Sequence, residues 1–129
     1  MLSYVTIGAR DTAEGTAFYD AVLGAIGYKR FADYGAFTGY GVGGKSDGQS
    51  VWVCKPFDGN DARAGNGIMV AFDAADRAQV HAFYDAAMKH GGSDEGPRGP
   101  RASYGPNWYA AYLRDPTGNK LAIVCNKPA

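Results

Sequence analysis

The pentapeptide AFYDA occurs twice in this 129-residue chain, at positions 17–21 and again at 82–86. The longer segments around it, DTAEGTAFYDAVLGAIG and DRAQVHAFYDAAMKHGG, begin at Asp11 and Asp76 and are identical at eight of seventeen positions. Self-similarity at a fixed spacing is the sequence signature of a duplicated structural unit. The repeat therefore predicts a fold made of two copies of one unit.

Each repeated segment predicts an amphipathic helix. Asp11 and Asp76 are favourable N-cap residues, and Gly27 and Gly91–Gly92 are expected to end the two helices. Apolar residues recur at intervals of three and four, which places them on one core-facing stripe. The stripe consists of Ala13, Ala17, Phe18, Ala21, Val22 and Leu23 in the first helix and Ala78, Phe83, Ala86, Ala87 and Met88 in the second. We interpret AFYDA as architectural rather than catalytic.

One β-rich run precedes each helix and three follow it, which gives the order βαβββ twice. The predicted strands are 4–8, 28–34, 36–42, 51–55, 67–72, 93–96, 109–114 and 120–125. KSDGQ (45–49) and DPTGN (115–119) have the composition of tight turns. PFDGNDARAGN, residues 56–66, is the expected joint between the copies. The chain is thus predicted to be one domain, 1–129, composed of modules 1–58 and 66–127.

Side-chain alternation along the strands separates two faces of the predicted sheets. One apolar set is expected to pack against the helices: Val5, Ile7, Val51, Val53, Val70, Phe72, Leu121 and Ile123. The opposite face is mixed and holds Tyr4, Thr6, Ser50, Trp52, Cys54, Met69, Ala71, Ala110, Tyr112, Arg114, Lys120 and Ala122. Large rings with a few polar groups suit the lining of a pocket, although the same side chains would also fill a two-sheet sandwich.

The charge balance and the two cysteines bear on location and partners. Thirteen basic and thirteen acidic residues give a net charge of zero, which argues against nucleic acid and membrane surfaces as partners. No apolar run approaches the roughly 20 residues that span a bilayer, and the start of the chain lacks a secretory leader pattern. Cys54 and Cys125 have no metal-ligand spacing. We therefore expect a cytoplasmic protein whose partner is a small molecule or a second copy of itself.

The stretch GYGVGGKS, residues 39–46, matches two nucleotide-binding patterns, GxxxxGKS and GxGxxG. Such a loop holds phosphates only when it opens a helix whose N-terminal amides face the ligand. The following residues, DGQSVWVCKP, contain Gly, β-branched residues and Pro, so they predict a strand. Nucleoside triphosphate binding is therefore not expected.

The two βαβββ units and the closing segment YAAYLRDPTGNKLAIV (109–124) together resemble the vicinal oxygen chelate superfamily. This superfamily comprises glyoxalases, bleomycin-resistance proteins and extradiol dioxygenases. The resemblance covers nearly the whole chain and is most specific at DPTGNK. It implies an α+β fold in which two tandem βαβββ modules with mixed sheets form a cup around a ligand. It also implies a homodimer, because members of the superfamily commonly pair.

In metal-dependent members of the superfamily, the first and last strands of each module carry the metal ligands, usually His and Glu. By the resemblance, these positions are occupied here by Tyr4, Trp52, Met69 and Ala122. None of them has the side chain that a divalent ion in such a site requires. The only histidines, His81 and His90, lie nine residues apart on the second predicted helix, a spacing that does not bring both to one ion. We therefore expect no metal and no cofactor.

The predicted ligand site consists of rings and cations of the mixed face, namely Tyr4, Trp52, Met69, Tyr112, Arg114 and Lys120. The rings would stack on a planar molecule and the cations would hold a carboxylate or phenolate. Arg98 and Arg101 are placed in a loop, either as further anion ligands or as solvated residues. The sequence thus favours a metal-free protein that binds a small aromatic or hydrophobic molecule. The alternative is a metal-dependent lyase of glyoxalase type, or an extradiol-type dioxygenase, with atypical ligands.

Overall fold

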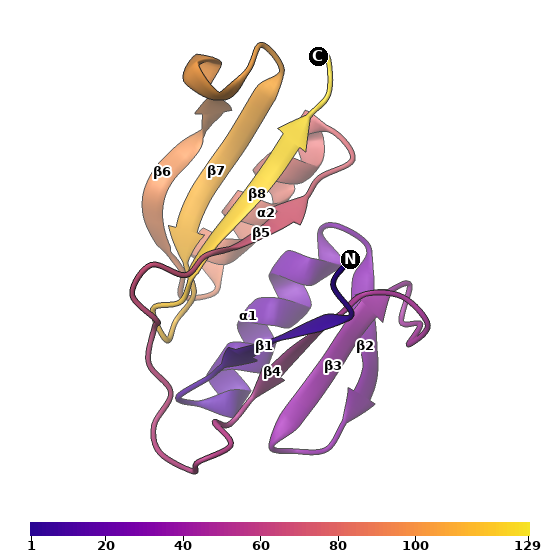
Figure 1. The fold of residues 1–129 in the computed structure, drawn as a ribbon, viewed down its shortest axis with the longest axis vertical. Helices are drawn as coiled ribbons and strands as arrows, with labels where there is room; N and C mark the ends of the chain where they lie inside the picture. Colours follow the sequence, from indigo (N-terminus) through magenta and orange to yellow (C-terminus); the bar gives the residue numbers. More distant parts are fainter.

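The computed structural model describes residues 1–129 and contains two βαβββ modules in tandem (Figure 1). The first module comprises β1 (Tyr4–Gly8), α1 (Thr12–Gly24), β2 (Tyr28–Asp33), β3 (Phe37–Val42) and β4 (Ser50–Cys54). The second comprises β5 (Val70–Asp73), α2 (Arg77–Lys89), β6 (Ser93–Pro100), a short 3-10 helix (Ala102–Tyr104), β7 (Trp108–Arg114) and β8 (Lys120–Asn126). The predicted fold class and element order are confirmed. Both predicted module boundaries, 58 and 66, fall in the connection between β4 and β5.

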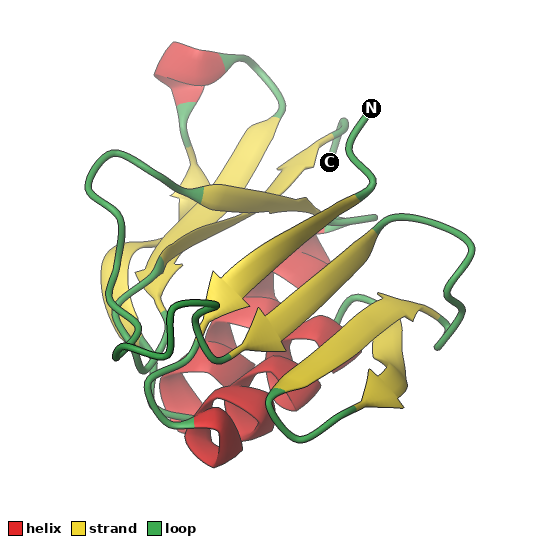
Figure 2. Ribbon diagram, turned by 60° about the horizontal axis from the view of Figure 1, so that its bottom comes forward, coloured by secondary structure: helices red, strands yellow, loops and turns green.

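Each module forms one mixed four-stranded sheet, with strand orders β1-β4-β3-β2 and β5-β8-β7-β6. In each sheet the first and last strands of the module pair in parallel, and the other neighbours are antiparallel. The two registers are equivalent, because Val5 pairs with Val51 and Val70 with Leu121. The helices contact each other and lie on one side of the two sheets, as Figure 2 shows. The opposite side of each sheet carries no helix and is called its open face.

The apolar strand positions face the helices, as alternation predicts. Val51, Val53, Leu121 and Ile123 are buried in a single core, and Val5 and Val70 pack against it. The helical stripes differ from the prediction, since Ala13, Ala17 and Ala78 are exposed. The buried helical residues are instead Gly15, Phe18, Tyr19, Val22 and Leu23 on α1 and Val80, Phe83 and Ala87 on α2. A Cβ at Gly15 would lie 2.7 Å from Ala9 Cβ, so glycine permits the close approach of this face.

Both helices begin as predicted. The Asp11 and Asp76 carboxylates accept hydrogen bonds from the backbone N–H groups of Glu14 (3.0 Å) and Gln79 (2.9 Å). Helix α2 ends in a Schellman motif, in which Gly91 has a φ of 94° and the N–H of Gly92 donates to the carbonyl of Ala87. The expected role of Gly27 as cap of α1 is wrong. The chain leaves α1 at Ala25 and reaches Gly27 through two successive i→i+3 bonds.

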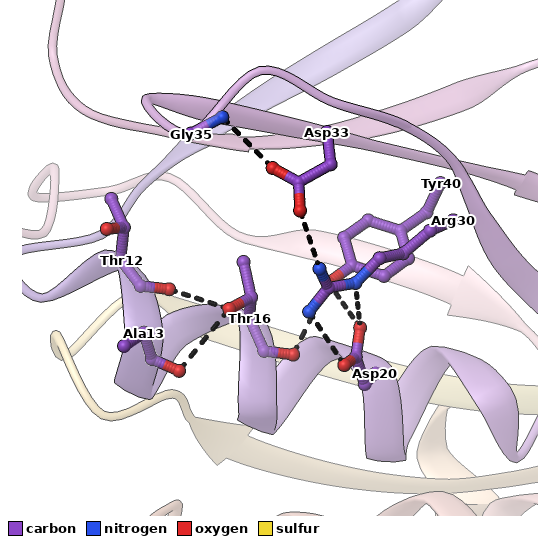
Figure 3. Close-up of polar contacts among 8 residues, drawn as sticks. All are labelled: Thr12, Ala13, Thr16, Asp20, Arg30, Asp33, Gly35 and Tyr40. Carbon is purple, nitrogen blue, oxygen red and sulfur yellow. Dashed lines mark hydrogen bonds and ion pairs between the residues drawn. The ribbon is translucent and has the colours of Figure 1, made fainter.

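The aspartate of each AFYDA copy joins its helix to the outer strand of its own module. Asp20 pairs with Arg30 of β2 through two hydrogen bonds, of 2.7 and 2.8 Å, and also accepts a bond from the Tyr40 hydroxyl (Figure 3). Asp85 forms an ion pair with Arg98 of β6, through the single contact of Nη1 with Oδ1. The repeated motif therefore supplies a core phenylalanine and an edge-strand anchor in both modules. The predicted core-facing helix is therefore confirmed in both copies.

Strand β6 is longer than predicted, because it continues past Gly96 to Pro100. Arg98 therefore lies in a strand, and the prediction that it belongs to a loop is wrong. Arg101 is fixed by hydrogen bonds to the carbonyls of Pro97 (2.6 Å) and Gly99 (2.9 Å). Both arginines thus have partners within the chain.

The DPTGN turn joins β7 to β8, as predicted, and also connects the two modules. The buried Asp115 accepts a hydrogen bond from Tyr19 of α1, and its Oδ1 accepts three backbone N–H groups of its own turn. The Asn119 side chain donates to the carbonyl of Gly8 at the end of β1 (2.8 Å). Arg10 donates to both oxygens of Thr117. A turn of the second module is therefore bound to two elements of the first.

Candidate ligand-binding site

A cavity of about 1130 Å³ lies on the open face of the first sheet. Its floor comes from β1, β3 and β4, and one wall comes from the connection that follows β4. The lining residues are Ser3, Tyr4, Thr6, Gly8, Phe31, Ala36, Phe37, Ser46, Gly48, Ser50, Trp52, Cys54, Lys55, Pro56, Phe57, Asp58, Asp61, Ala62 and Arg63. Two of the predicted ligand-binding residues, Tyr4 and Trp52, are among them. The parallel pairing of β1 with β4 brings them together, because Tyr4 pairs with Ser50 and Thr6 with Trp52.

The indole of Trp52 lies against the neighbouring strand. Gly39 is its register partner on β3, and a Cβ at Gly39 would come within 2.8–2.9 Å of the Trp52 ring carbons. Any other residue at position 39 would therefore displace the ring. The indole N–H donates to Ser50 Oγ at 3.1 Å, which fixes the ring further. Trp52 is thus a pre-positioned flat surface in the cavity.

Further rings surround Trp52. Phe31 meets it edge-on at 5.4 Å between ring centroids, and Phe37 is tilted against it at 5.9 Å. Tyr34 is nearly parallel to the indole, with an interplanar angle of 6° and a centroid separation of 6.4 Å. Edge-on and offset arrangements are the favourable geometries for aromatic pairs. Tyr4 and Phe57 remain largely exposed and provide ring surface without an intramolecular partner.

The residues Phe31, Phe37 and Phe57 were not predicted as site residues. A signal for the first two was present in the glycines of β3. Gly39 and Gly41 alternate with the buried Thr38 and Tyr40, and glycine inside a strand indicates close approach of another group. Phe57 carried no comparable signal, because its position depends on the path of the connection after β4.

The same glycines account for the apparent nucleotide-binding motif. Residues 39–42 belong to β3, and β4 is the next element, so no helix follows the glycine-rich stretch. Phosphate recognition of that type requires a helix N-terminus. The motif is therefore a strand whose glycines leave room for Trp52 and for the backbone of Lys45.

The polar groups of the cavity do not form a nucleophilic centre. Burial raises the pKa of Cys54, which favours the thiol over the reactive thiolate. No histidine lines the cavity. His81 lies against Tyr109, 2.5 Å from its hydroxyl, and the His90 ring contacts the carbonyl of Ala86. Both histidines therefore have contacts within the chain, His81 with Tyr109 of β7 and His90 with Ala86 of α2.

The other predicted site residues lie elsewhere. Met69, Arg114 and Lys120 line a second cavity, of about 600 Å³, which shares no residue with the first. Tyr112 lines neither cavity. Its hydroxyl accepts a hydrogen bond from the Trp108 indole at 3.2 Å, and the Arg101 guanidinium lies 5.5 Å from its ring centroid. The open face of the second sheet is thus partly covered by its own side chains.

The positions that carry metal ligands in related proteins do not fit a divalent ion here. Ala122 is fully buried and has no donor atom, and the Trp52 N–H is already used by Ser50. Tyr4 and Met69 line different cavities. Nowhere in the chain do three or more His, Cys, Asp or Glu side chains gather in a metal-binding arrangement. The side chains at these four positions therefore do not fit a divalent metal ion, and we derive no reaction step that uses one. The expected absence of metal and cofactor stays a prediction.

The duplicated fold places the chain in a class of small α+β proteins that are built from two βαβββ modules, each with one mixed sheet. Comparison with known proteins identifies the family within this class. The model of the Glyoxalase/Bleomycin resistance protein/Dioxygenase superfamily matches residues 1–123. The chain belongs to this superfamily. No helix is both long and apolar enough to span a membrane.

Solved structures support the same assignment. A glyoxalase/bleomycin resistance protein from Albidiferax ferrireducens T118 is 33% identical, with 98% of each chain covered and a TM-score of 0.85. A putative glyoxalase from Bacillus halodurans is 27% identical, with 97% of this chain and 95% of that chain covered and a TM-score of 0.75. A lactoylglutathione lyase from Agrobacterium tumefaciens is 21% identical, with 97% of this chain and 92% of that chain covered and a TM-score of 0.65. This likeness shows a shared fold. No protein with a curated description matches the chain.

Proposed function

We propose that the chain binds a small planar aromatic or hydrophobic molecule in the cavity over the first sheet, without a metal ion. The observation that carries this proposal is the position of Trp52, held flat over Gly39 and bordered by Phe31 and Phe37. A ring fixed in advance loses little conformational freedom when a ligand stacks on it. Tyr4 and Phe57 add exposed aromatic surface at the cavity rim.

The polar lining suits recognition better than catalysis. Lys55, Asp61 and Arg63 form no ion pair within the chain, so their charges are available to a polar group of the ligand. Neither a histidine base nor an activated thiolate is present in the cavity. General acid–base chemistry would depend on the Tyr4 phenol or on exposed carboxylates. The lining therefore favours a binding or sequestering role.

Binding of the neutral fluorophore N-phenyl-1-naphthylamine tests this proposal. Trp52→Ala removes the stacking surface and is expected to weaken binding by about 1–2 kcal/mol, or roughly five- to thirtyfold in Kd. Trp108→Ala is the matched control, because Trp108 lies on the open face of the second sheet, outside the cavity. Circular dichroism confirms that both variants are folded. Equal affinities of Trp52→Ala and the wild type would refute the stacking role.

The alternative function is that of a metal-dependent lyase or an extradiol-type dioxygenase with atypical ligands. Elemental analysis of the purified protein separates the two proposals. A metal-free binding protein contains far less than one equivalent of Fe, Mn, Ni or Zn. About one tightly held ion per chain would favour the enzyme, because a catalytic site retains its metal through three protein ligands.

We further propose that the chain forms a homodimer in the cytoplasm. The large side chains of Leu2 and Tyr34 are each 66% exposed, and an interface between two copies would remove them from water. Light scattering coupled to size-exclusion chromatography measures the mass directly. A species of 13.6 kDa at all concentrations would contradict the dimer.

A further inference from the structure

The second cavity differs from the first in its charge. It lies at the start of β8 and is bordered by the connection before β5. Its lining consists of Ala64, Gly65, Asn66, Gly67, Ile68, Met69, Arg114 and Lys120. Two of these residues are cations and none is an acid. The cavity is therefore positively charged and contains no aromatic ring.

The two cations face each other across the β7–β8 ladder. Arg114 and Lys120 are register partners, so their side chains emerge on the same face of the sheet. Like charges directly opposite each other destabilise a strand pair unless another group compensates them. Arg114 has such partners, because its Nε donates to Glu95 Oε1 at 2.6 Å and its Nη1 to the carbonyl of Gly118 at 2.8 Å. Lys120 has neither a hydrogen bond nor an ion pair, although it is half-buried.

Hydrogen-bond donors without a partner in the chain line the same cavity as Lys120. No backbone N–H group of residues 64–69 donates to another group of the chain. The Asn66 side-chain amide also has no partner, and neither does Nη2 of Arg114. Cations together with free amides are the groups that bind carboxylate and phosphate oxygens. The cavity thus combines one ammonium without an ion pair with hydrogen-bond donors that have no partner within the chain.

We infer that this cavity is a binding site for an oxyanion, the carboxylate or phosphate group of a small ligand, held by Lys120 and Arg114. The exposed side chains of Ile68 and Met69 at its edge would contact the apolar remainder of the ligand. This site goes beyond the aromatic cavity and is distinct from it, because no residue lines both.

NMR titration tests this inference: 15N-labelled protein is titrated with sodium phosphate and, separately, with sodium acetate at constant ionic strength, and the amide chemical shifts are followed. The amide resonances of Gly65, Asn66 and Gly67 are expected to shift saturably. Lys120→Gln is expected to weaken binding about tenfold, which corresponds to the loss of one charge-assisted hydrogen bond. Lys29→Gln is the matched control, since Lys29 is exposed on β2 and lines neither cavity. Its affinity should equal that of the wild type.

A second variant guards against a purely structural effect of Lys120→Gln. Asn66→Asp keeps both cations and adds a negative charge to the exposed rim, so it is expected to weaken anion binding as well. Saturation with phosphate alone assigns a phosphorylated ligand, and saturation with acetate alone assigns a carboxylate. Linear shifts with both anions, or an unchanged affinity of Lys120→Gln, would overturn the site. Neither result affects the proposal of an aromatic ligand, which is tested by the affinity of wild type and Trp52→Ala for a neutral fluorophore.

Discussion

Tyr19 of α1 donates a hydrogen bond of 2.6 Å to Oδ2 of Asp115, a buried carboxylate in the turn between β7 and β8. The two residues belong to different modules and lie 96 positions apart in the sequence. A buried carboxylate that loses a donor retains its desolvation penalty, so this bond matters more than an exposed one. It is therefore a main polar connection between the two halves of the fold.

Tyr19→Phe is expected to lower the free energy of unfolding by about 1–3 kcal/mol, because Oδ2 of Asp115 keeps only the Asn119 amide as donor. Urea unfolding followed by circular dichroism measures the change. Tyr84→Phe is the matched control from the second AFYDA copy, whose hydroxyl donates to Asp94 in an exposed setting. It should cost less than about 0.5 kcal/mol. Equal costs for the two variants would contradict the proposed importance of burial.

The same pair predicts a dependence of stability on alkaline pH. Burial, followed by the charge of Asp115, raises the pKa of Tyr19 well above its usual value. The folded state therefore holds this proton more tightly than the unfolded chain, whose tyrosine pKa is about 10. Stability is fully present below about pH 10 and falls as the pH rises towards the folded-state pKa. The stability difference between wild type and Tyr19→Phe should narrow above about pH 10 in urea titrations. A constant difference from pH 8 to pH 11 would exclude this linkage.

The two repeated aspartates should differ in their effect on stability. Asp20→Ala removes an exposed ion pair with Arg30 and the 2.8 Å acceptor of the buried Tyr40 hydroxyl, which keeps only a 3.3 Å contact with the carbonyl of Thr16 (Figure 3). The expected cost is about 1–2 kcal/mol. Asp85→Ala removes an exposed pair alone and should cost less than about 0.5 kcal/mol. Both residues occupy the same position of a helix, so helix propensity cancels. Thermal unfolding of the two variants provides the comparison, and a larger loss for Asp85→Ala would contradict it.

Gly39→Ala tests whether the packing of the Trp52 ring against Gly39 fixes the position of the ring. The new methyl group would lie within 2.9 Å of the indole, so the ring must move, at an expected cost of about 1–3 kcal/mol of stability. Near-UV circular dichroism should change, and the affinity for N-phenyl-1-naphthylamine should fall. Gly24→Ala is the control, because a Cβ there meets no atom within 4 Å. If Gly39→Ala left both the spectrum and the affinity unchanged, the ring would not rest on this glycine.

Much of the fold could be predicted from the sequence because its determinants are local. The duplicated helices follow from Asp11 and Asp76 as caps, and the core faces of the strands follow from alternation. Strand β6 was underestimated because SDEGPRGP contains no β-branched or aromatic residue, and its pairing with β7 decides its structure.

The candidate site could be predicted only in part. Tyr4 and Trp52 share a cavity because the parallel pairing of β1 with β4 brings them together. The βαβββ repeat in the sequence made it possible to predict this. Tyr112 emerges on the expected face, yet contacts with Trp108 and Arg101 occupy its ring. The assignment of residues to two separate cavities depends on the path of residues 55–69. No periodicity in the sequence encodes that path.

This connection has a consequence for how such a protein diversifies. Its first half contributes to the aromatic cavity and its second half to the cationic one, while neither half belongs to a sheet. Insertions and deletions in surface loops cost little folding energy. A gain or loss of a few residues between Lys55 and Met69 would thus recast the ligand preference of both cavities at once and leave the duplicated scaffold unchanged.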